Sequence, residues 1–347
     1  MGWVKVKGVL VGVATATTSS PALTAQLTVR ATNGTISGIV IDTVSGQPVA
    51  YALIISGDHR RFASDAGRFV VSDLAEGPHE LTVTQIGYGP HRQIVRVTSS
   101  DTARAAVAEL RILLWRQALV LPELRVTASR SCARGVAPTG GAIEPTIGAA
   151  LENAERVLVL EEAYPFKSAF VFHATEIDDL NRVLGSRVSS LTTNTESMKG
   201  YRPGRVLERS KGPINYFTTS DLARPAFRNR HCFWHAGVDT VDGRALHLID
   251  FAPTTDLTTP DWAGRLTIDG TTARLTRSEA SLVNFDTMKV KIRGASCIVS
   301  YAEVVPTIIH ETSSQCQLVE QRKRLTTRIE QLRLVRLQFL GRKPGDR

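Results

Sequence analysis

His173 and Glu176 stand three residues apart, and both are residue types that can ligate a metal ion. A third histidine, His310, lies far downstream. Two neutral imidazoles and one carboxylate suit a catalytic zinc ion that keeps one position open for water. The pattern therefore raises the hypothesis of metal-assisted hydrolysis. Because so short a pattern also arises by chance, we expect these three side chains to be ordinary core or surface residues.

A second group of possible ligands lies in the aromatic-rich run from His231 to His235. On a helix, two histidines four residues apart lie on one face and can share a metal ion. On a strand they lie on the same side but farther apart. We favour a structural role, in which Cys232 forms a disulfide and the aromatic rings fill a core. We therefore predict no metal site and no cofactor at either group.

Three acidic residues fall in or beside predicted turns, at Asp42, Asp65 and Asp73. Calcium takes several oxygen ligands, and such carboxylates can provide them. Their more common role is to accept hydrogen bonds from turn amides, which we predict here. The chain contains no G-x-S-x-G sequence, P-loop or dinucleotide-binding glycine motif. The sequence therefore favours a protein that is not an enzyme.

The cysteines are even in number, which indicates two disulfides if the chain folds in an oxidising compartment. They are Cys132, Cys232, Cys297 and Cys316. Four cysteines allow three pairings, and the sequence leaves all three open. We favour Cys132–Cys232 and Cys297–Cys316, because the second pair closes a short local loop. None of them forms a C-x-x-C pair of the kind found in zinc or thioredoxin-like sites.

The first 25 residues have the order of a secretory signal peptide. Lys5 and Lys7 precede a short apolar run at 9–16, and small residues follow at 22–25. The run is too short to cross a bilayer, which requires about 20 apolar residues. We predict an exported protein, in the periplasm, at the outer-membrane surface or outside the cell, without a transmembrane span.

The chain of 347 residues has a formal net charge of +9. Positive charge favours anionic partners through long-range attraction. Arginine and lysine are spread along the whole chain, however, and no nucleic-acid-binding motif is present. We therefore predict no nucleic-acid partner. The expected partner is an envelope protein, a glycan or an anionic surface.

Residues 26–110 consist of short apolar runs separated by turns. The runs that predict strands are 35–42, 49–55, 68–71, 79–85 and 93–97. Glycine and proline mark the turns between them. Strands at such regular spacing, with no helix between them, indicate a β-sandwich.

The same segment contains a series of motifs in a fixed order. They are G-x-I-x-G-x-V-x-D at 34–42, S-G-x-P at 45–48, S-D-x-x-G-x-F at 64–69, L-x-x-G-x-H-x-L at 74–81, and Gly87-Tyr88. In these motifs it resembles the carboxypeptidase regulatory-like (transthyretin-like) domain. The resemblance implies a seven-stranded-type sandwich that binds or scaffolds and does not catalyse.

Residues 111–145 are predicted to form a linker, although 101–116 can be either a helix or an added edge strand. Within the linker, residues 121–128 resemble the segment that follows such domains in TonB-dependent receptors. The chain is too short to contain the barrel of those receptors. This resemblance implies, as an alternative function, an accessory component of a TonB-type outer-membrane uptake system.

Residues 146–347 are predicted to form a second, β-rich (α+β) domain, with a helix at 146–159 and a strand at 166–174. The runs 264–269 and 273–275 are similar to strand pairs of outer-membrane lipoprotein-sorting proteins. Those proteins have curved sheets that bind lipid or protein chains. The expected function is thus a non-catalytic secreted or outer-membrane-associated binding or scaffold protein.

The basic, leucine-rich segment 317–342 is compatible with a helix or a strand. Its apolar residues Leu318, Leu325, Ile329, Leu332 and Phe339 fit one face of a helix. We favour a helix that packs on a sheet over one that lies on a membrane.

One further resemblance concerns catalysis. The sequence from His173 to Glu176 has the H-x-x-E form of two metal ligands in zinc carboxypeptidases. It implies a zinc-dependent hydrolase, with His310 as the third ligand, as a second alternative. The catalytic domain of that family precedes its sandwich, whereas here the sandwich comes first. The region after the sandwich also lacks the alternating helix–strand pattern of that enzyme.

Overall fold

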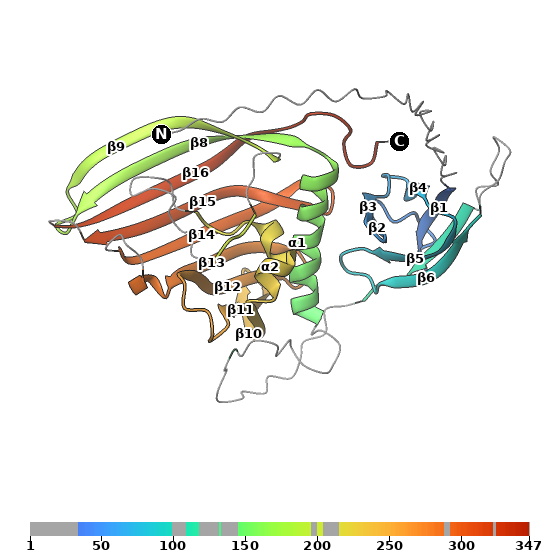
Figure 1. The fold of residues 1–347 in the computed structure, drawn as a ribbon, viewed down its shortest axis with the longest axis horizontal. Helices are drawn as coiled ribbons and strands as arrows, with labels where there is room; N and C mark the ends of the chain where they lie inside the picture. The colour runs from blue at the N-terminus through green and yellow to red at the C-terminus, as the bar shows by residue number, and fades with distance from the viewer. Residues whose placement is uncertain are drawn as a thin grey trace, which may run out of the picture.

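The computed structural model describes residues 34–98, 109–117, 132, 145–195, 200–203, 215–287, 292–321 and 324–346. Over these residues the chain forms a β-sandwich and a large curved sheet, with one long helix between them (Figure 1). The fold is mainly β, as predicted. The predicted signal peptide and the segment 121–128 lie outside the described residues.

Two sheets make up the N-terminal sandwich, and all their strand pairs except β1–β7 are antiparallel. One has the order β4-β1-β7 and the other β3-β2-β5-β6. The bounds are β1 (Gly34–Asp42), β2 (Leu53–Ser56), β3 (His59–Phe62), β4 (Arg68–Leu74), β5 (Gly77–Thr84), β6 (His91–Val97) and β7 (Glu109–Leu114). Alternate residues of each strand point inward, and they form one core with Val40, Ile54 and Leu81 at its centre. Strand β7 runs parallel to β1 and carries the sandwich past residue 110, where we predicted the linker to begin.

Asp42 closes the first turn of the sandwich. Its carboxylate accepts hydrogen bonds from the amides of Val44 and Ser45, at 2.8 and 3.0 Å. It also accepts one from the Tyr88 hydroxyl and pairs with Arg116 at 2.7 Å. These donors, the guanidinium first, hold the pKa of Asp42 well below its usual range. Asp42 therefore has the turn-stabilising role that the sequence predicts.

The second unit is a nine-stranded sheet with the order β10-β11-β12-β13-β14-β15-β16-β8-β9. All of its neighbouring strands are antiparallel. The bounds are β8 (Phe166–Asp178), β9 (Val183–Asn194), β10 (His231–Val241), β11 (Arg244–Pro253), β12 (Asp261–Asp269), β13 (Leu275–Val283), β14 (Ile292–Val305), β15 (Ile308–Gln321) and β16 (Leu325–Phe339). The predicted strand at 166–174 is thus confirmed and extends to Asp178.

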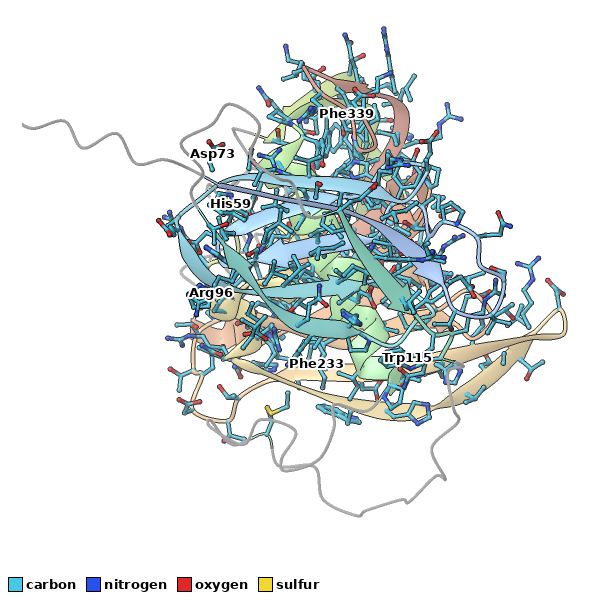
Figure 2. The ribbon with its side chains drawn as sticks, turned by 90° about the vertical axis from the view of Figure 1, so that its right-hand side faces the viewer. His59, Asp73, Arg96, Trp115, Phe233 and Phe339 are labelled. Carbon is cyan, nitrogen blue, oxygen red and sulfur yellow. A yellow bond between two sulfur atoms is a disulfide. The ribbon has the colours of Figure 1, made fainter. Side chains whose placement is uncertain are left out.

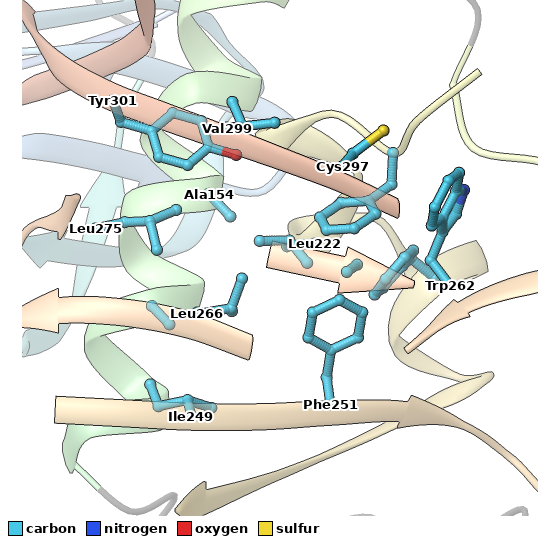
Figure 3. Close-up of a cluster of buried hydrophobic side chains, with 14 of the residues drawn as sticks. Ala154, Leu222, Ile249, Phe251, Trp262, Leu266, Leu275, Cys297, Val299 and Tyr301 are labelled. Atoms are coloured by element: carbon cyan, nitrogen blue, oxygen red, sulfur yellow. The ribbon is translucent and has the colours of Figure 1, made fainter. Parts of the chain in front are cut away.

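Helix α1 (Pro145–Ala163) lies across the concave face of this sheet, in agreement with the predicted helix at 146–159. Two short segments, η2 (Thr219–Ala223) and α2 (Pro225–Arg228), pack beside it. Together they bury a core that contains Ala154, Leu222 and Phe251 (Figure 3). No helix in the described part of the chain has the length and apolar character needed to cross a membrane.

The helix favoured for residues 317–342 is wrong: this segment forms the end of β15 and the whole of β16. Strand β16 pairs with β15 on one side and with β8 on the other. A bulge between Leu334 and Arg336 inserts one extra residue. Because of it, the inward side chains fall at Leu332, Leu334, Leu337 and Phe339, and the single spacing of three resembles helical periodicity.

Two disulfides join Cys132 to Cys232 and Cys297 to Cys316, the pairing that we favoured. The first ties a residue outside the sheets to edge strand β10. The second joins residues that lie directly opposite each other on β14 and β15. Three of these four cysteines lie on strands of the large sheet, so the disulfides stabilise that sheet.

Arg156 of α1 joins the sheet to the sandwich. Its side chain is fully buried and donates hydrogen bonds to the Tyr51 carbonyl and to both Thr307 oxygens, over 2.5–3.0 Å. The guanidinium carbon lies 5.0 Å from the centre of the Phe62 ring. Nearby, the Phe62 amide donates to the Tyr164 hydroxyl at 3.2 Å. Viewed from the sandwich side, α1 stands behind the sandwich, with the large sheet beyond it (Figure 2).

We expect Arg156→Met to lower the free energy of unfolding by about 3 kcal/mol, because it leaves buried carbonyl acceptors without a donor. Methionine keeps the aliphatic stem, so packing is largely retained. The control is Arg60→Ala, which removes a half-exposed ion pair with Glu155 at 3.8 Å and should cost less than about 1 kcal/mol. Urea unfolding followed by circular dichroism measures both; equal effects would contradict this role.

Two glutamates of α1 with carboxylate oxygens shielded from water make this region sensitive to pH. Burial raises the pKa of Glu152, which faces Thr84 of the sandwich, from 4.5 to about 7. Burial raises the pKa of Glu161 likewise to about 7. In the unfolded chain both groups ionise near 4.5, so the folded state binds more protons between the two values. Their contribution to stability therefore falls as the pH rises through this range.

Glu152→Gln should remove about half of the loss of stability that the two glutamates cause as the pH rises. At pH 4 the variant and the parent protein should have similar melting temperatures, because both side chains are then neutral. From pH 4.5 to 8 the variant should become progressively more stable than the parent. Differential scanning calorimetry across this range tests the prediction, and a constant difference at all pH values would refute it.

Candidate functional site: an open end of the concave sheet face

Strand register shows which side chains share the concave face. Phe172 of β8 lies opposite Leu332 of β16, Leu332 opposite Ser314 of β15, and Ser314 opposite Val299 of β14. Residues opposite one another in a sheet point to the same side. Val299 belongs to the buried core beneath α1, so this whole row faces the concave side.

The concave face is open toward its β9 edge. Helix α1 packs across β10 to β13 and β15, whereas β8, β9 and β16 run on past it to the far end of the sheet (Figure 1). Phe172, Leu332 and Leu334 are only partly buried there. Leu191 of β9, which shares a row with Phe170 and Leu334, is 41% exposed. These side chains form an apolar strip that no described helix covers.

Charged side chains take over farther along the same strands. Glu330 and Arg187 lie on either side of Ala174, and Arg328 lies opposite Glu176. The Arg328 guanidinium pairs with Glu330 at 2.9 Å, and both side chains are largely buried. The Arg187 guanidinium carbon lies 5.5 Å from the centre of the Phe172 ring, where the apolar strip ends. The open face thus changes from apolar to charged along the strand direction.

Strand β9 forms the edge of this face. All its residues are exposed or only partly buried, and its apolar side chains Val183, Leu184, Val188 and Leu191 are 41–67% exposed. Within the described residues it pairs with β8 alone. Exposed apolar edge strands are normally blunted, because they invite pairing with another chain. Among the described residues, this edge therefore leaves backbone hydrogen-bonding groups without a strand partner beside the apolar strip.

The structure separates the predicted zinc ligands. Residues three apart on a strand point to opposite faces, and so His173 lies on the convex face while Glu176 lies on the concave one. His173 contacts the Ser186 hydroxyl at 2.9 Å. His310 is buried near α1, 3.1 Å from the Ser168 hydroxyl. Burial lowers the pKa of His310 to about 4, so it is neutral at physiological pH.

His231 and His235 both lie on strand β10, and their rings have different neighbours. The His231 ring stacks on Phe227 at 3.7 Å, and its Nδ1 lies 3.0 Å from the Phe227 carbonyl oxygen. Its Nε2 lies 3.5 Å from the Asp261 carboxylate. The His235 ring instead lies 5.9 Å from that of His247. The described residues contain no group of three or more ligands arranged to hold a metal ion.

The apolar strip was not identified from the sequence. Its members come from 166–178, 183–194 and 325–339, and the last of these segments was assigned to a helix. The available signal was the alternation of Phe166, Phe170, Phe172 and Ala174 on one side of the predicted strand. That pattern predicts one apolar face but does not show that the face is uncovered.

Residues 35–110 match the carboxypeptidase regulatory-like domain, so the chain carries this domain, as predicted. No curated protein sequence matches the chain. Solved structures with similarity include a putative outer-membrane lipoprotein-sorting protein domain from Vibrio parahaemolyticus (13% identity, TM-score 0.32, 58% of this chain and 96% of that one). A DUF1329 family protein from Desulfovibrio piger is also similar, with 13% identity and a TM-score of 0.31 over 57% of this chain and 95% of that one. A LolA superfamily protein from Nitrosomonas europaea has 10% identity and a TM-score of 0.30 over 56% of this chain and 94% of that one.

We expect zinc binding to be independent of the predicted ligand set. The protein and a His173→Ala/Glu176→Gln variant should hold the same amount of zinc after incubation with the ion and desalting, because the two side chains face opposite ways. Atomic absorption measures the metal content. One equivalent of zinc in the parent protein, lost in the variant, would contradict this prediction.

Proposed function

We propose that this protein is a non-catalytic binding protein of the cell envelope, which holds an extended, amphiphilic ligand on the open end of its concave sheet. The observation that carries the proposal is the strip of Phe172, Leu191, Leu332 and Leu334. These side chains continue the row of the buried core but remain partly exposed. A ligand that covers them completes the core, and the gain scales with the apolar area removed from water.

The shape of the ligand follows from the shape of the strip. The strip runs along the strands and gives way to Glu176, Arg328 and Glu330 at its far end. A chain with an apolar body and a polar or charged end matches this change. A fatty acyl chain satisfies it, and so does an apolar peptide segment, which in addition would pair with the free edge of β9.

The cellular location is part of the proposal. Two disulfides are typical of proteins that fold in an oxidising, extracytoplasmic compartment. The carboxypeptidase regulatory-like domain brings no recognised catalytic motif with it. We propose that the sandwich serves as a support for α1, while the large sheet binds the ligand.

Leu191→Asp provides a sharp test, because Val188→Asp is a matched control on the same strand. Leu191 faces the concave side and Val188, opposite His173, the convex side. Both are exposed, so neither change should unfold the protein. Binding is measured by the fluorescence of cis-parinaric acid, a fatty acid, and by the anisotropy of a fluorescein-labelled apolar peptide.

We expect saturable binding of at least one of these two probes. Leu191→Asp should weaken it about tenfold or more, since losing the burial of one leucine costs about 1.5–3 kcal/mol. Val188→Asp should have little effect. Absence of saturable binding for both probes, or equal losses in the two variants, would reject the proposed site.

A further inference from the structure

A cavity lies beside the sandwich, away from the open sheet face. It has a volume of 320 Å³, and its lining includes residues of β3 and β4, the edge strands of the two sheets. The buried rings of Phe62 and Phe69 belong to its lining, one from each sheet. Tyr164, just after α1, and the C-terminal segment with Arg342 complete it. This size lies at the lower end of the range for small-molecule sites.

Two carboxylates and three guanidinium groups line the cavity. Glu109 pairs with Arg68 at 2.5 Å. Asp346 accepts a hydrogen bond from the amide of Lys343 at 2.8 Å. The lining therefore carries a net positive charge, from Arg61, Arg68 and Arg342 against Glu109 and Asp346.

Several hydrogen-bond donors of the cavity remain available to a ligand. Arg61 and Arg342 line the cavity, and neither forms an ion pair with any described residue. The hydroxyl of Tyr164 accepts from the Phe62 amide, and that of Ser64 accepts from the Arg68 amide. Each hydroxyl thus keeps its own proton to donate. Two arginine residues and two hydroxyl groups thus line the same cavity as the rings of Phe62 and Phe69.

We infer that this cavity binds a small organic oxyanion, a carboxylate or phosphate ester carried on an aromatic or apolar body. Guanidinium groups form strong, charge-assisted hydrogen bonds to such oxygens. The body of the ligand packs against Phe62, Phe69 and Tyr164. Arg61 comes from the sandwich and Arg342 from the segment after β16, so a bound anion links the two units. This site is separate from the open sheet face and does not depend on the function proposed for it.

The test uses four probes and the full chain. Benzoate and phenyl phosphate carry both an oxyanion and a ring; inorganic phosphate lacks the ring, and benzyl alcohol lacks the charge. Isothermal titration calorimetry and ligand-observed NMR measure their dissociation constants. At least one aromatic anion should bind saturably, and about tenfold more tightly than benzyl alcohol and inorganic phosphate.

An Arg61→Ala/Arg342→Ala variant should weaken this binding about tenfold or more. Its control is Arg92→Ala/Arg96→Ala, which makes the same change in net charge at exposed positions of β6 outside the cavity. Val70→Trp should also weaken binding by narrowing the cavity without any change in charge. Circular dichroism checks that each variant is folded.

Three results would overturn the inference. One is the absence of saturable binding for every anion. Another is an equal loss in the Arg92→Ala/Arg96→Ala control, which would show a general effect of charge. The third is benzyl alcohol binding as tightly as benzoate, which would remove the role of the guanidinium groups.

Discussion

Helix α1 has to be buried on two sides at once, and the arrangement of both units depends on this constraint. Ile147, Ala150 and Val157 pack into the concave sheet. Val159 and Leu160, farther along, pack with Leu53 and Phe62 of the sandwich. A helix that is apolar on more than one side is stable only when it is covered on each of them. The carboxypeptidase regulatory-like domain therefore completes the cover of a helix that the curved sheet covers in part.

Because α1 is buried on both sides, the polar side chains that it carries need hydrogen-bond partners inside the protein. The Asn153 side chain donates a hydrogen bond to the Ala273 carbonyl at 2.9 Å and accepts one from the Leu275 amide at 3.3 Å. The Arg156 guanidinium donates hydrogen bonds to the carbonyls of Tyr51 and Thr307, one in each unit. Tyr51 has a φ of 54°, in the left-handed region that is unfavourable for a side chain of this size. The hydrogen bond from Arg156 supports the backbone at that point.

The sequence predicted the sandwich well because its information is local. Turn glycines and acidic residues follow one another in a fixed order, and Gly67, at a φ of 69°, has no room for a Cβ beside the Val40 carbonyl. Strand β7 was harder to assign, because it pairs with β1 across a long segment of chain. The C-terminal strand was mistaken for a helix because its bulge at Leu334–Arg336 breaks the alternation that identifies a strand.

The open face could not be predicted, since it is a property of strand register rather than of any one segment. Phe172 and Leu332 are neighbours because β16 inserts between β8 and β15. Whether they are covered depends on where α1 crosses the sheet: it lies near one end of the strands, which continue past it (Figure 1). The same register places His173 and Glu176 on opposite faces. One geometric fact, the two-residue period of β8, thus both separates the predicted zinc ligands and aligns the apolar side chains of the proposed binding strip.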